Sequence, residues 1–275
     1  MVYCMRYLDE RVWVILNELR PLIDRQHIDI TKWQIKKKLF MRPCEADKDE
    51  TPWENFDSAK DRWYGKDTYY WFRSQFTVPQ SMDGKCIFLK IHTQIEEWDD
   101  GRNPQFLLFI NGKVTQGQDM NHREVRLTDC AKAGETYTLD LQAYTGILHN
   151  EFSLMVTASE TDLALLKLYY DLKAPADAYH YNRMMQGRTK SLIVEALNGA
   201  LNLLDLRTPH SPEFDASVAA AQEYINEHLY KNPELSGHDD IIASSIGHTH
   251  IDVAWWWTVS QTREKTARSF STVLK

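Results

Sequence analysis

The spacing of apolar residues changes near position 161 of this 275-residue chain. Over residues 68–158 apolar side chains alternate with polar ones, most clearly at 68–78 and 86–92. Successive side chains of a β-strand point to opposite faces, so a period of two predicts half-buried strands. Asn111-Gly112 lies between two such segments and is a strong hairpin-turn signal. Short strands in series, separated by turn residues, predict an antiparallel β-sandwich over about 68–160.

A helical prelude is predicted before the strands, over residues 7–25, where apolar residues recur at a spacing near 3.6. Pro21 lies inside this pattern and is expected to kink or end the helix. Between the prelude and the strands, the basic run at 32–38 is interpreted as a solvated face. Residues 42–65 carry prolines, acidic residues and aromatics, and are predicted to form a long irregular segment held to a surface by its aromatic rings.

Helical spacing returns from residue 161 and continues to about 232. Pro175 is expected to end a first helix, and a second is predicted over about 177–206. Ser211-Pro212 is a start signal for a third helix. No constellation of titratable residues stands out here, so residues 161–236 are interpreted as a helical linker that spaces two domains.

An apolar run at 241–246 leads into His248, His250 and Asp252. The run predicts a buried strand, and alternate residues of a strand share one face, so the three polar side chains would converge at its end. Imidazole and carboxylate groups are ligands that a divalent cation such as zinc accepts. The residues alone leave two interpretations open: a metal site, or a strand end whose polar groups bond to one another.

The residues that follow this run carry a resemblance to a known family. His-Thr-His-Ile-Asp-Val-Ala-Trp at 248–255, followed by Gln-Thr-Arg-Glu-Lys-Thr-Ala-Arg-Ser-Phe-Ser at 261–271, resembles the first strand and helix of glycoside hydrolase family 38, the retaining α-mannosidases. The resemblance implies that His250 and Asp252 are zinc ligands, and that Trp255 packs against the sugar in the cleavage subsite. His248 matches a position that is not a ligand, and we expect it to support the ligands from outside the coordination sphere.

The strand-rich segment carries a second resemblance. Tyr-Trp-Phe-Arg-x-x-Phe-x-Val-Pro at 70–79, Phe-Ile-Asn-Gly at 109–112 and Asp-x-x-His-Arg at 119–123 resemble the jelly-roll, galactose-binding-like domain that precedes the catalytic domain in cytosolic and bacterial members of this family. Taken alone, the polar group Asp119, His122 and Arg123 either binds a sugar or, more often for such a group, closes a loop with internal hydrogen bonds.

The expected fold class is therefore multidomain α+β. Residues 1–160 are predicted to form an N-terminal domain that includes the helical prelude and the β-sandwich. The helical linker at 161–236 follows. Residues 237–275 are predicted to begin an α/β-barrel catalytic domain with its first strand and first helix, the helix starting near Thr262 with Ala267, Phe270 and Leu274 on one face.

These last residues are too few to form an active site. A parallel barrel strand needs neighbours on both sides, and a zinc site normally takes at least three protein ligands. The resemblance implies that the remaining ligands, the nucleophile and the general acid/base lie downstream of the matched positions. We therefore expect the N-terminal portion of a retaining, zinc-dependent α-mannosidase that hydrolyses terminal α-mannosides of oligosaccharides, and we expect this chain to be inactive by itself.

Two other functions are weighed against this one. Metal-dependent amidohydrolases also carry His-x-His at the end of their first barrel strand, although usually near the start of the chain and without the match at Trp255. The second alternative is a non-catalytic carbohydrate-binding or interaction module, because a sandwich with exposed aromatic rings can bind sugars. Titration with mannosides, with and without zinc, separates a carbohydrate-binding module from a domain with a structural role only.

Charge and composition limit the partners. The net charge is −7 with acidic and basic residues interspersed, which argues against binding to nucleic acid or to an anionic membrane. The N-terminus lacks the apolar core of a signal peptide, and no apolar run approaches the roughly 20 residues of a membrane span. The four cysteines are widely spaced and are expected to be free thiols. We expect a soluble cytoplasmic protein, and the resemblance implies a homo-oligomer.

Overall fold

The chain folds into two compact units, each with its own hydrophobic core. The structure is a computed structural model that describes residues 2–92, 104–181, 187–236, 242, 244–246, 250–255 and 257–275, with side chains from Tyr7 onward. The first unit joins Met1–Arg25 to Thr161–Ser245, and the second joins Gln26–Glu160 to Ile246–Lys275. This division differs from the predicted one, because the helical prelude groups with the later helices and not with the sheets.

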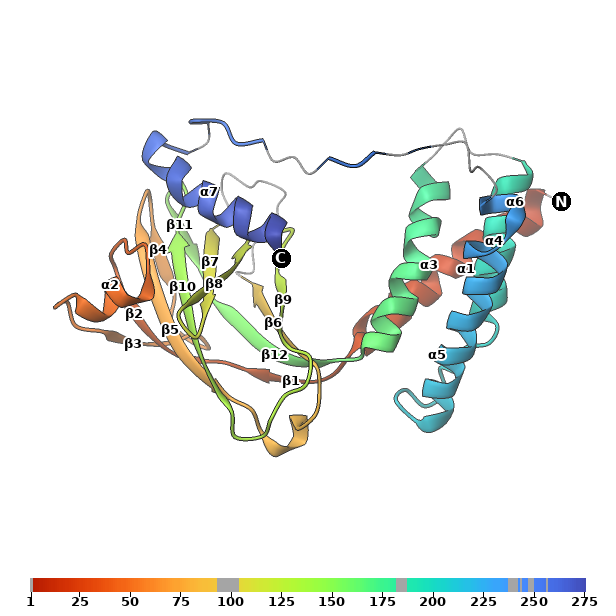
Figure 1. Ribbon diagram of the computed structural model, residues 1–275, viewed down its shortest axis with the longest axis horizontal. Helices are drawn as coiled ribbons and strands as arrows, with labels where there is room; N and C mark the ends of the chain where they lie inside the picture. The colour runs from red at the N-terminus through yellow and green to blue at the C-terminus, as the bar shows by residue number, and fades with distance from the viewer. Residues whose placement is uncertain are drawn as a thin grey trace. The chain divides into compact units, whose positions relative to one another are not determined.

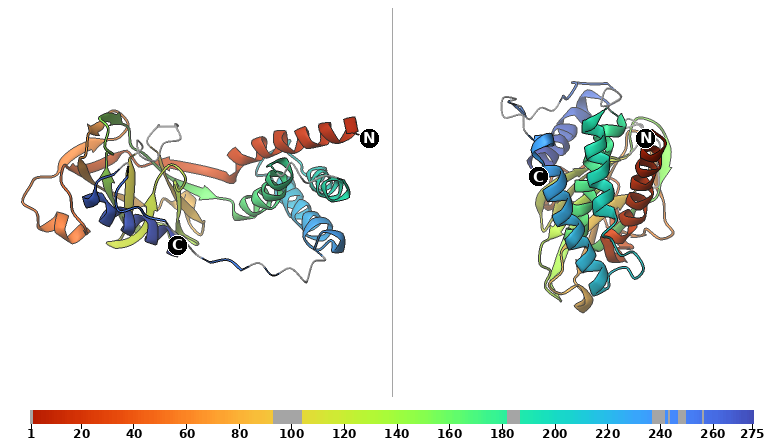
Figure 2. Two further views of the ribbon diagram at one scale, coloured as in Figure 1. Left: turned by 90° about the horizontal axis from the view of Figure 1, so that it is seen from above. Right: turned by 90° about the vertical axis from the view of Figure 1, so that its right-hand side faces the viewer.

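The first unit is helical. Its core joins Val12, Leu16 and Leu19 of the first helix to Leu165 and Leu172 of a later one, which explains why the prelude belongs here. Figures 1 and 2 show the first helix alongside α3 and α4. The elements in chain order are α1 (Val2–Leu19), η1 (Arg20–Ile23), α3 (Leu163–Tyr181), α4 (Arg188–Leu201), α5 (Pro212–Ile225), η3 (Asn226–Tyr230) and α6 (Pro233–Ser236).

The predicted end of α1 at Pro21 and the predicted start of α5 at Ser211 are confirmed, whereas the predicted helix end at Pro175 is not. Pro21 ends α1, as predicted, and the chain continues as the short 3-10 turn η1. Ser211 caps α5, since its Oγ accepts a hydrogen bond of 3.1 Å from the Phe214 backbone N–H. The prediction that Pro175 ends a helix is wrong, because α3 continues through it. Leu172 and Ala176 are fully buried beside it, so packing outweighs the one backbone bond that proline removes.

The second unit contains two antiparallel sheets that share one core, in agreement with the predicted layered arrangement (Figure 1). The six-stranded sheet has the order β3 (Glu54–Asp57), β2 (Lys32–Lys36), β5 (Tyr69–Thr77), β10 (Thr136–Tyr144), β7 (Gln105–Ile110), β8 (Lys113–Gln118). The four-stranded sheet has the order β1 (Asp24–Asp29), β12 (Met155–Thr161), β6 (Ile87–His92), β9 (Glu124–Thr128). A small sheet pairs β11 (Asn150–Phe152) with β4 (Trp63–Gly65), and α2 (Pro43–Lys48) and η2 (Gln80–Met82) complete the unit.

The hairpin between β7 and β8 turns at Asn111 and Gly112, as predicted. Their φ angles are +50° and +78°, the left-handed values that an Asn-Gly turn accommodates. The three cysteines whose side chains the structure describes, Cys44, Cys86 and Cys130, are free thiols, which agrees with the expectation for these positions. Among the described helices, none combines the length and the apolar character needed to cross a membrane.

Residues 24–65 are more regular than the sequence predicts. They contain β1 to β4 and α2, and Trp63 of β4 is a core residue whose ring centroid lies 4.8 Å from that of Phe152 and 5.4 Å from that of Phe72. The basic run is only partly solvated. Lys36 is 3% exposed, and its Nζ donates to the carbonyl oxygens of Ala46 at 2.8 Å and Asp49 at 3.0 Å. Backbone acceptors compensate this buried charge, which charge patterning alone does not reveal.

Candidate metal centre and its supporting helix

Two of the predicted metal-site residues lie in contact. His250 Nε2 is 2.8 Å from Asp252 Oδ1, and the pair faces solvent, with the side chains 74% and 33% exposed. The two side chains, two residues apart in the sequence, lie on the same side of the chain, although residues 250–252 form no strand. His248 lies outside the described residues.

The donor atoms fit part of a zinc site. Imidazole nitrogen and carboxylate oxygen both bind zinc at about 2.0–2.2 Å, so two ligands of one tetrahedral ion lie roughly 3.3 Å apart. The separation of 2.8 Å between His250 and Asp252 is shorter and is that of a direct hydrogen bond, which corresponds to the interpretation in which the two polar groups bond to each other. Within the described part of the chain, no group of three or more His, Cys, Asp or Glu side chains is arranged to hold a metal ion. If zinc binds here, His250 and Asp252 would supply two of its ligands, and a closed site would need more.

Trp255 and Trp257, which follow Asp252, have different surroundings. The Trp255 side chain is 69% exposed, so its ring is open to a partner or ligand. Trp257 instead lies beneath Lys265, whose Nζ is 4.2 Å from the ring centroid. The hydroxyl of Thr262 donates to the Val253 carbonyl oxygen and connects the loop that bears the metal ligands to the helix that follows.

The described residues of the apolar run, 242 and 244–246, are exposed to solvent. Ile242 and Ile246 are each 88% exposed, and residues 244–246 carry no strand. A parallel strand is stable only with neighbouring strands to bond to, and the described residues place none beside this run. The predicted buried strand is not observed at the described residues, and both this strand and the barrel that would contain it stay predictions.

The helix after the ligands, α7 (Val259–Leu274), turns its polar face inward. Gln261, Glu264 and Arg268 are 1%, 3% and 7% exposed, whereas Phe270 and Leu274 are 51% and 86% exposed. The sequence predicts an apolar face, but the helix lies against β8, a strand rich in polar and small residues (Figure 1). The side chains that meet such a strand are those that can hydrogen-bond to it.

Polar contacts attach α7 to the six-stranded sheet. Gln261 Nε2 donates to the Tyr69 hydroxyl, and Arg268 Nη2 donates to Gln105 Oε1 at 2.8 Å. Burial raises the pKa of Tyr69, which therefore stays a neutral phenol at physiological pH. Burial also lowers the pKa of the Arg268 guanidinium to about 10, a value that still leaves it charged at neutral pH.

Gly117 of β8 allows this close approach. A Cβ at this position would lie 2.7 Å from the Arg268 carbonyl oxygen and 2.9 Å from Thr272 Oγ1. Both distances are shorter than van der Waals contact, so only glycine accommodates the helix at its present position. No motif in the sequence singles out Gly117, Gln105 or Arg268, since each acts through a partner more than 100 residues away.

The loop after β8 is closed by its own residues. Asp119 Oδ1 accepts backbone hydrogen bonds of 2.8 Å from both Asn121 and His122, and lies 3.0 Å from His122 Nδ1. This arrangement matches the loop-closing interpretation of the polar group and not the sugar-binding one.

Comparison with known proteins agrees with the resemblance seen in the sequence. Residues 240–275, which span the ligand pair and α7, match the family described as glycosyl hydrolases family 38 N-terminal domain. The chain is 24% identical over 224 residues to alpha-mannosidase 2C1 of Mus musculus, which covers 74% of this chain and 20% of that protein. It is 24% identical over 226 residues to alpha-mannosidase G of Dictyostelium discoideum, covering 74% of this chain and 19% of that protein. The predicted resemblance to this family is thereby confirmed, and the chain spans about a fifth of the length of these relatives.

Solved structures give only a weak likeness. A β-glucuronidase from Ruminococcus gnavus aligns with a TM-score of 0.33 and 10% identity, covering 49% of this chain and 29% of that one. A likeness at this level supports no argument about function.

Proposed function

We propose that this chain is the N-terminal part of a retaining, zinc-dependent α-mannosidase of glycoside hydrolase family 38. The observation that carries the proposal is the match over residues 240–275, which includes His250 and Asp252 at a separation of 2.8 Å. The α-mannosidase relatives extend the similarity across 74% of the chain. The proposed substrate is a terminal α-mannoside of an oligosaccharide, and the proposed setting is a cytoplasmic homo-oligomer.

His250 and Asp252 would hold the metal, with His248 supporting them from outside the coordination sphere. Zinc, when bound, would act as a Lewis acid and a template for sugar hydroxyls. Asp252 has its carboxylate directed at His250 and would serve as a ligand, so we do not assign it as the nucleophile. The exposed ring of Trp255 would cover one face of the sugar and exclude water there.

Hydrolysis needs further groups. A retaining glycosidase uses two carboxyl groups about 5–5.5 Å apart, one as nucleophile and one as general acid/base. We place both outside this chain, which spans about a fifth of its α-mannosidase relatives. The chain by itself should therefore leave an aryl α-mannoside intact, and turnover by it that is abolished by His250→Ala would refute this assignment.

The metal assignment is tested in the longer protein that carries this chain. His250→Ala and Asp252→Ala should each remove bound zinc and α-mannosidase activity, whereas His248→Ala should weaken zinc binding by only about 10–100-fold. His149→Ala is the matched control, because this exposed histidine contacts only the Tyr64 ring among the described residues. Zinc content by elemental analysis after dialysis, together with turnover, gives both readouts.

Zinc analysis after dialysis and mannoside titration of this chain by itself distinguish the proposed function from an amidohydrolase and from a non-catalytic binding module. Two ligands should retain zinc weakly, so dialysis should remove it. Stoichiometric zinc retained with His248 as a third ligand would favour an amidohydrolase. Saturable mannoside binding in the absence of zinc would favour a non-catalytic binding module.

A further inference from the structure

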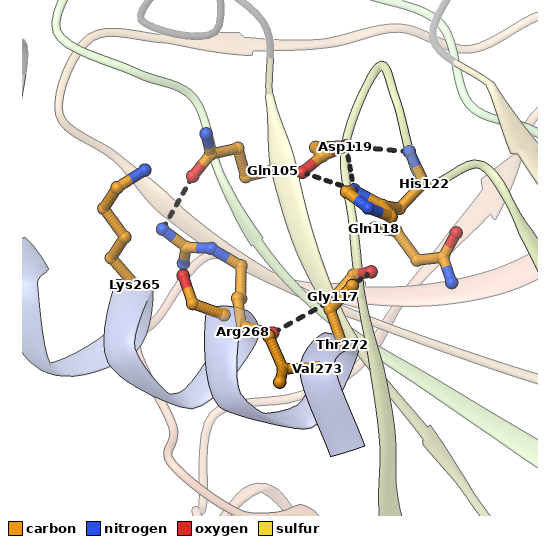
Figure 3. A pocket seen from close by; sticks show the side chains of 10 residues that line it. Gln105, Gly117, Gln118, Asp119, His122, Lys265, Arg268, Thr272 and Val273 are labelled. Carbon is orange, nitrogen blue, oxygen red and sulfur yellow. Dashed lines mark hydrogen bonds and ion pairs between the residues drawn. The ribbon is translucent and has the colours of Figure 1, made fainter. Parts of the chain in front are cut away.

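A cavity of about 170 Å³ lies between α7, β8 and the loop that follows β8. Figure 3 shows Arg268 on one side of it and the Asp119 loop on the other. A buried water needs only about 10–15 Å³ by this measure, so the cavity has room for a group of several heavy atoms. Most of the residues that line it have polar side chains, among them Gln105, Ser269 and Thr272, although apolar atoms also contribute to the surface.

Arg268 lines this cavity, and among the described residues only its Nη2 atom has hydrogen-bond acceptors. Its side chain is buried, with the residue only 7% exposed. Nη2 donates to Gln105 Oε1 at 2.8 Å and lies 3.5 Å from Gln261 Oε1, and both acceptors are uncharged amides. A guanidinium has five N–H donors. Among the described residues, no acceptor lies within hydrogen-bonding distance of Nε or Nη1, and no carboxylate forms an ion pair with this guanidinium.

The neighbouring charges leave this positive charge incompletely compensated. Glu264, one turn earlier on α7, attracts Arg268 through space but makes no ion pair with it in the described structure, and Glu264 Oε2 is buried without a hydrogen-bond partner. Asp119, which lines the cavity, also attracts Arg268 through space, but its carboxylate already accepts hydrogen bonds from its own loop. Lys265 lies over the Trp257 ring. A buried cation that contacts only neutral acceptors is a favourable partner for an anion that enters the cavity.

We propose that this cavity binds a compact oxyanion, a carboxylate or phosphoryl group, through Nε and Nη1 of Arg268. The Ser269 hydroxyl, on the next residue of the helix, lines the same cavity and is placed to donate to a second oxygen. The proposal concerns a site separate from His250 and Asp252 and does not depend on the proposed glycosidase activity.

The test is calorimetric titration of this chain with two anions and one neutral control. Inorganic phosphate represents a phosphoryl source, glucuronate represents a sugar carboxylate, and mannose is the uncharged sugar control. We expect saturable binding of at least one anion and none of mannose. The anion that binds identifies the source, and competition between the two identifies a shared site.

Variants assign the binding to Arg268. Arg268→Gln keeps hydrogen bonding but removes the charge, and should weaken binding roughly 10-fold or more, since hydrogen bonds to charged groups are the stronger ones. Arg263→Gln is the matched control, because Arg263 is an exposed arginine on the same helix and does not line the cavity. Ser269→Phe fills the cavity while leaving Arg268 in place, and should abolish binding.

Each result decides the proposal. Loss of binding in Arg268→Gln and Ser269→Phe, with wild-type affinity in Arg263→Gln, supports it. If Arg268→Gln does not fold, Ser269→Phe carries the decision. Absence of saturable binding of both anions by the folded wild-type chain overturns the proposal, as does undiminished binding in Ser269→Phe.

Discussion

Asp140 shows how single polar residues stabilise the interior of the sheet unit. It is 1% exposed, and its Oδ1 accepts hydrogen bonds from Trp71 Nε1 at 2.8 Å and Arg73 Nε at 2.6 Å. Burial alone would lower the pKa of Arg73, but its hydrogen bonds and charge interactions with Asp140 and Asp47 raise it. The Asp140 carboxylate thus gives the buried Trp71 N–H its acceptor and binds Arg73 together with Asp47.

Asp140→Ala should therefore destabilise the sheet unit by about 1–3 kcal/mol, since it leaves the buried Trp71 N–H without an acceptor and removes one of the two carboxylates that bind Arg73. Urea denaturation measures the change. Asp129→Ala is the control, because its 2.8 Å ion pair with Arg126 is solvent-exposed, and its loss should cost less than about 1 kcal/mol. Equal losses for the two variants would contradict the role given to Asp140.

The ionisation of Asp49 makes the free energy of unfolding depend on pH in the acid range. Hydrogen bonds from Lys38 and Thr51 lower its pKa from 3.8 to about 2. Because the pKa is lower in the folded state, the stabilisation from this carboxylate is present above its unfolded pKa and is lost as pH falls toward about 2. The difference in urea midpoint between wild type and Asp49→Asn should shrink over that interval. A difference that stays constant would contradict this linkage.

Helix α7 connects the loop that bears His250 and Asp252 to the sheets, through its packing on β8. Its contacts are polar, and its position depends on the absence of a side chain at Gly117. A single methyl group added at Gly117 would therefore collide with α7 and change the position of the helix.

Gly117→Ala should displace α7 and cost about 1–3 kcal/mol, as other small-to-large changes at close contacts do. Hydrogen exchange should show faster exchange of the α7 amides. Val114→Ala on the same strand is the control, since Val114 is 54% exposed. Unchanged protection of α7 in Gly117→Ala would show that the close approach does not position the helix.

Elements with strong local signals could be predicted from the sequence. The β7–β8 hairpin follows from alternating residues around Asn111-Gly112, and the start of α5 from Ser211-Pro212. Strand β1 could not be predicted, because Asp-Arg-Gln-His-Ile-Asp has no alternation and becomes a strand only through its neighbour β12. The inward face of α7 was predicted wrongly for a similar reason: apolar spacing implies an apolar contact, whereas the strand opposite it is polar.

The candidate site was predictable only in part. The His250–Asp252 contact joins residues two apart in the sequence. The contacts between Arg268 and Gln105 and between α7 and Gly117 join residues distant in sequence, and no local pattern contains them. The exposure of Ile242 and Ile246 depends on which strands are available to pair with them, which a single segment does not specify.

At the scale of the whole molecule, two separate cores hold the chain together. The buried residues of the helical unit and those of the sheet unit form distinct clusters. The chain passes between the units after Arg25, Glu160 and Ser245. Units with separate cores can unfold in separate steps.

Calorimetry should therefore show two unfolding transitions. Phe214→Ala in the helical core and Phe72→Ala in the sheet core each remove a fully buried ring and should each cost about 3–5 kcal/mol. Each variant should lower one transition and leave the other in place. A common shift of both transitions in either variant would show that the two cores unfold together.

The discontinuous helical unit has a consequence for synthesis on the ribosome. Helix α1 emerges first, yet the helices that cover its apolar face begin only at Leu163. At 5–20 residues per second, the roughly 140 intervening residues take about 7–28 s to translate. During that time the sheets can fold while Val12, Leu16 and Leu19 stay exposed. The nascent chain thus exposes the apolar face of α1 before any of the helices that cover it has been synthesised.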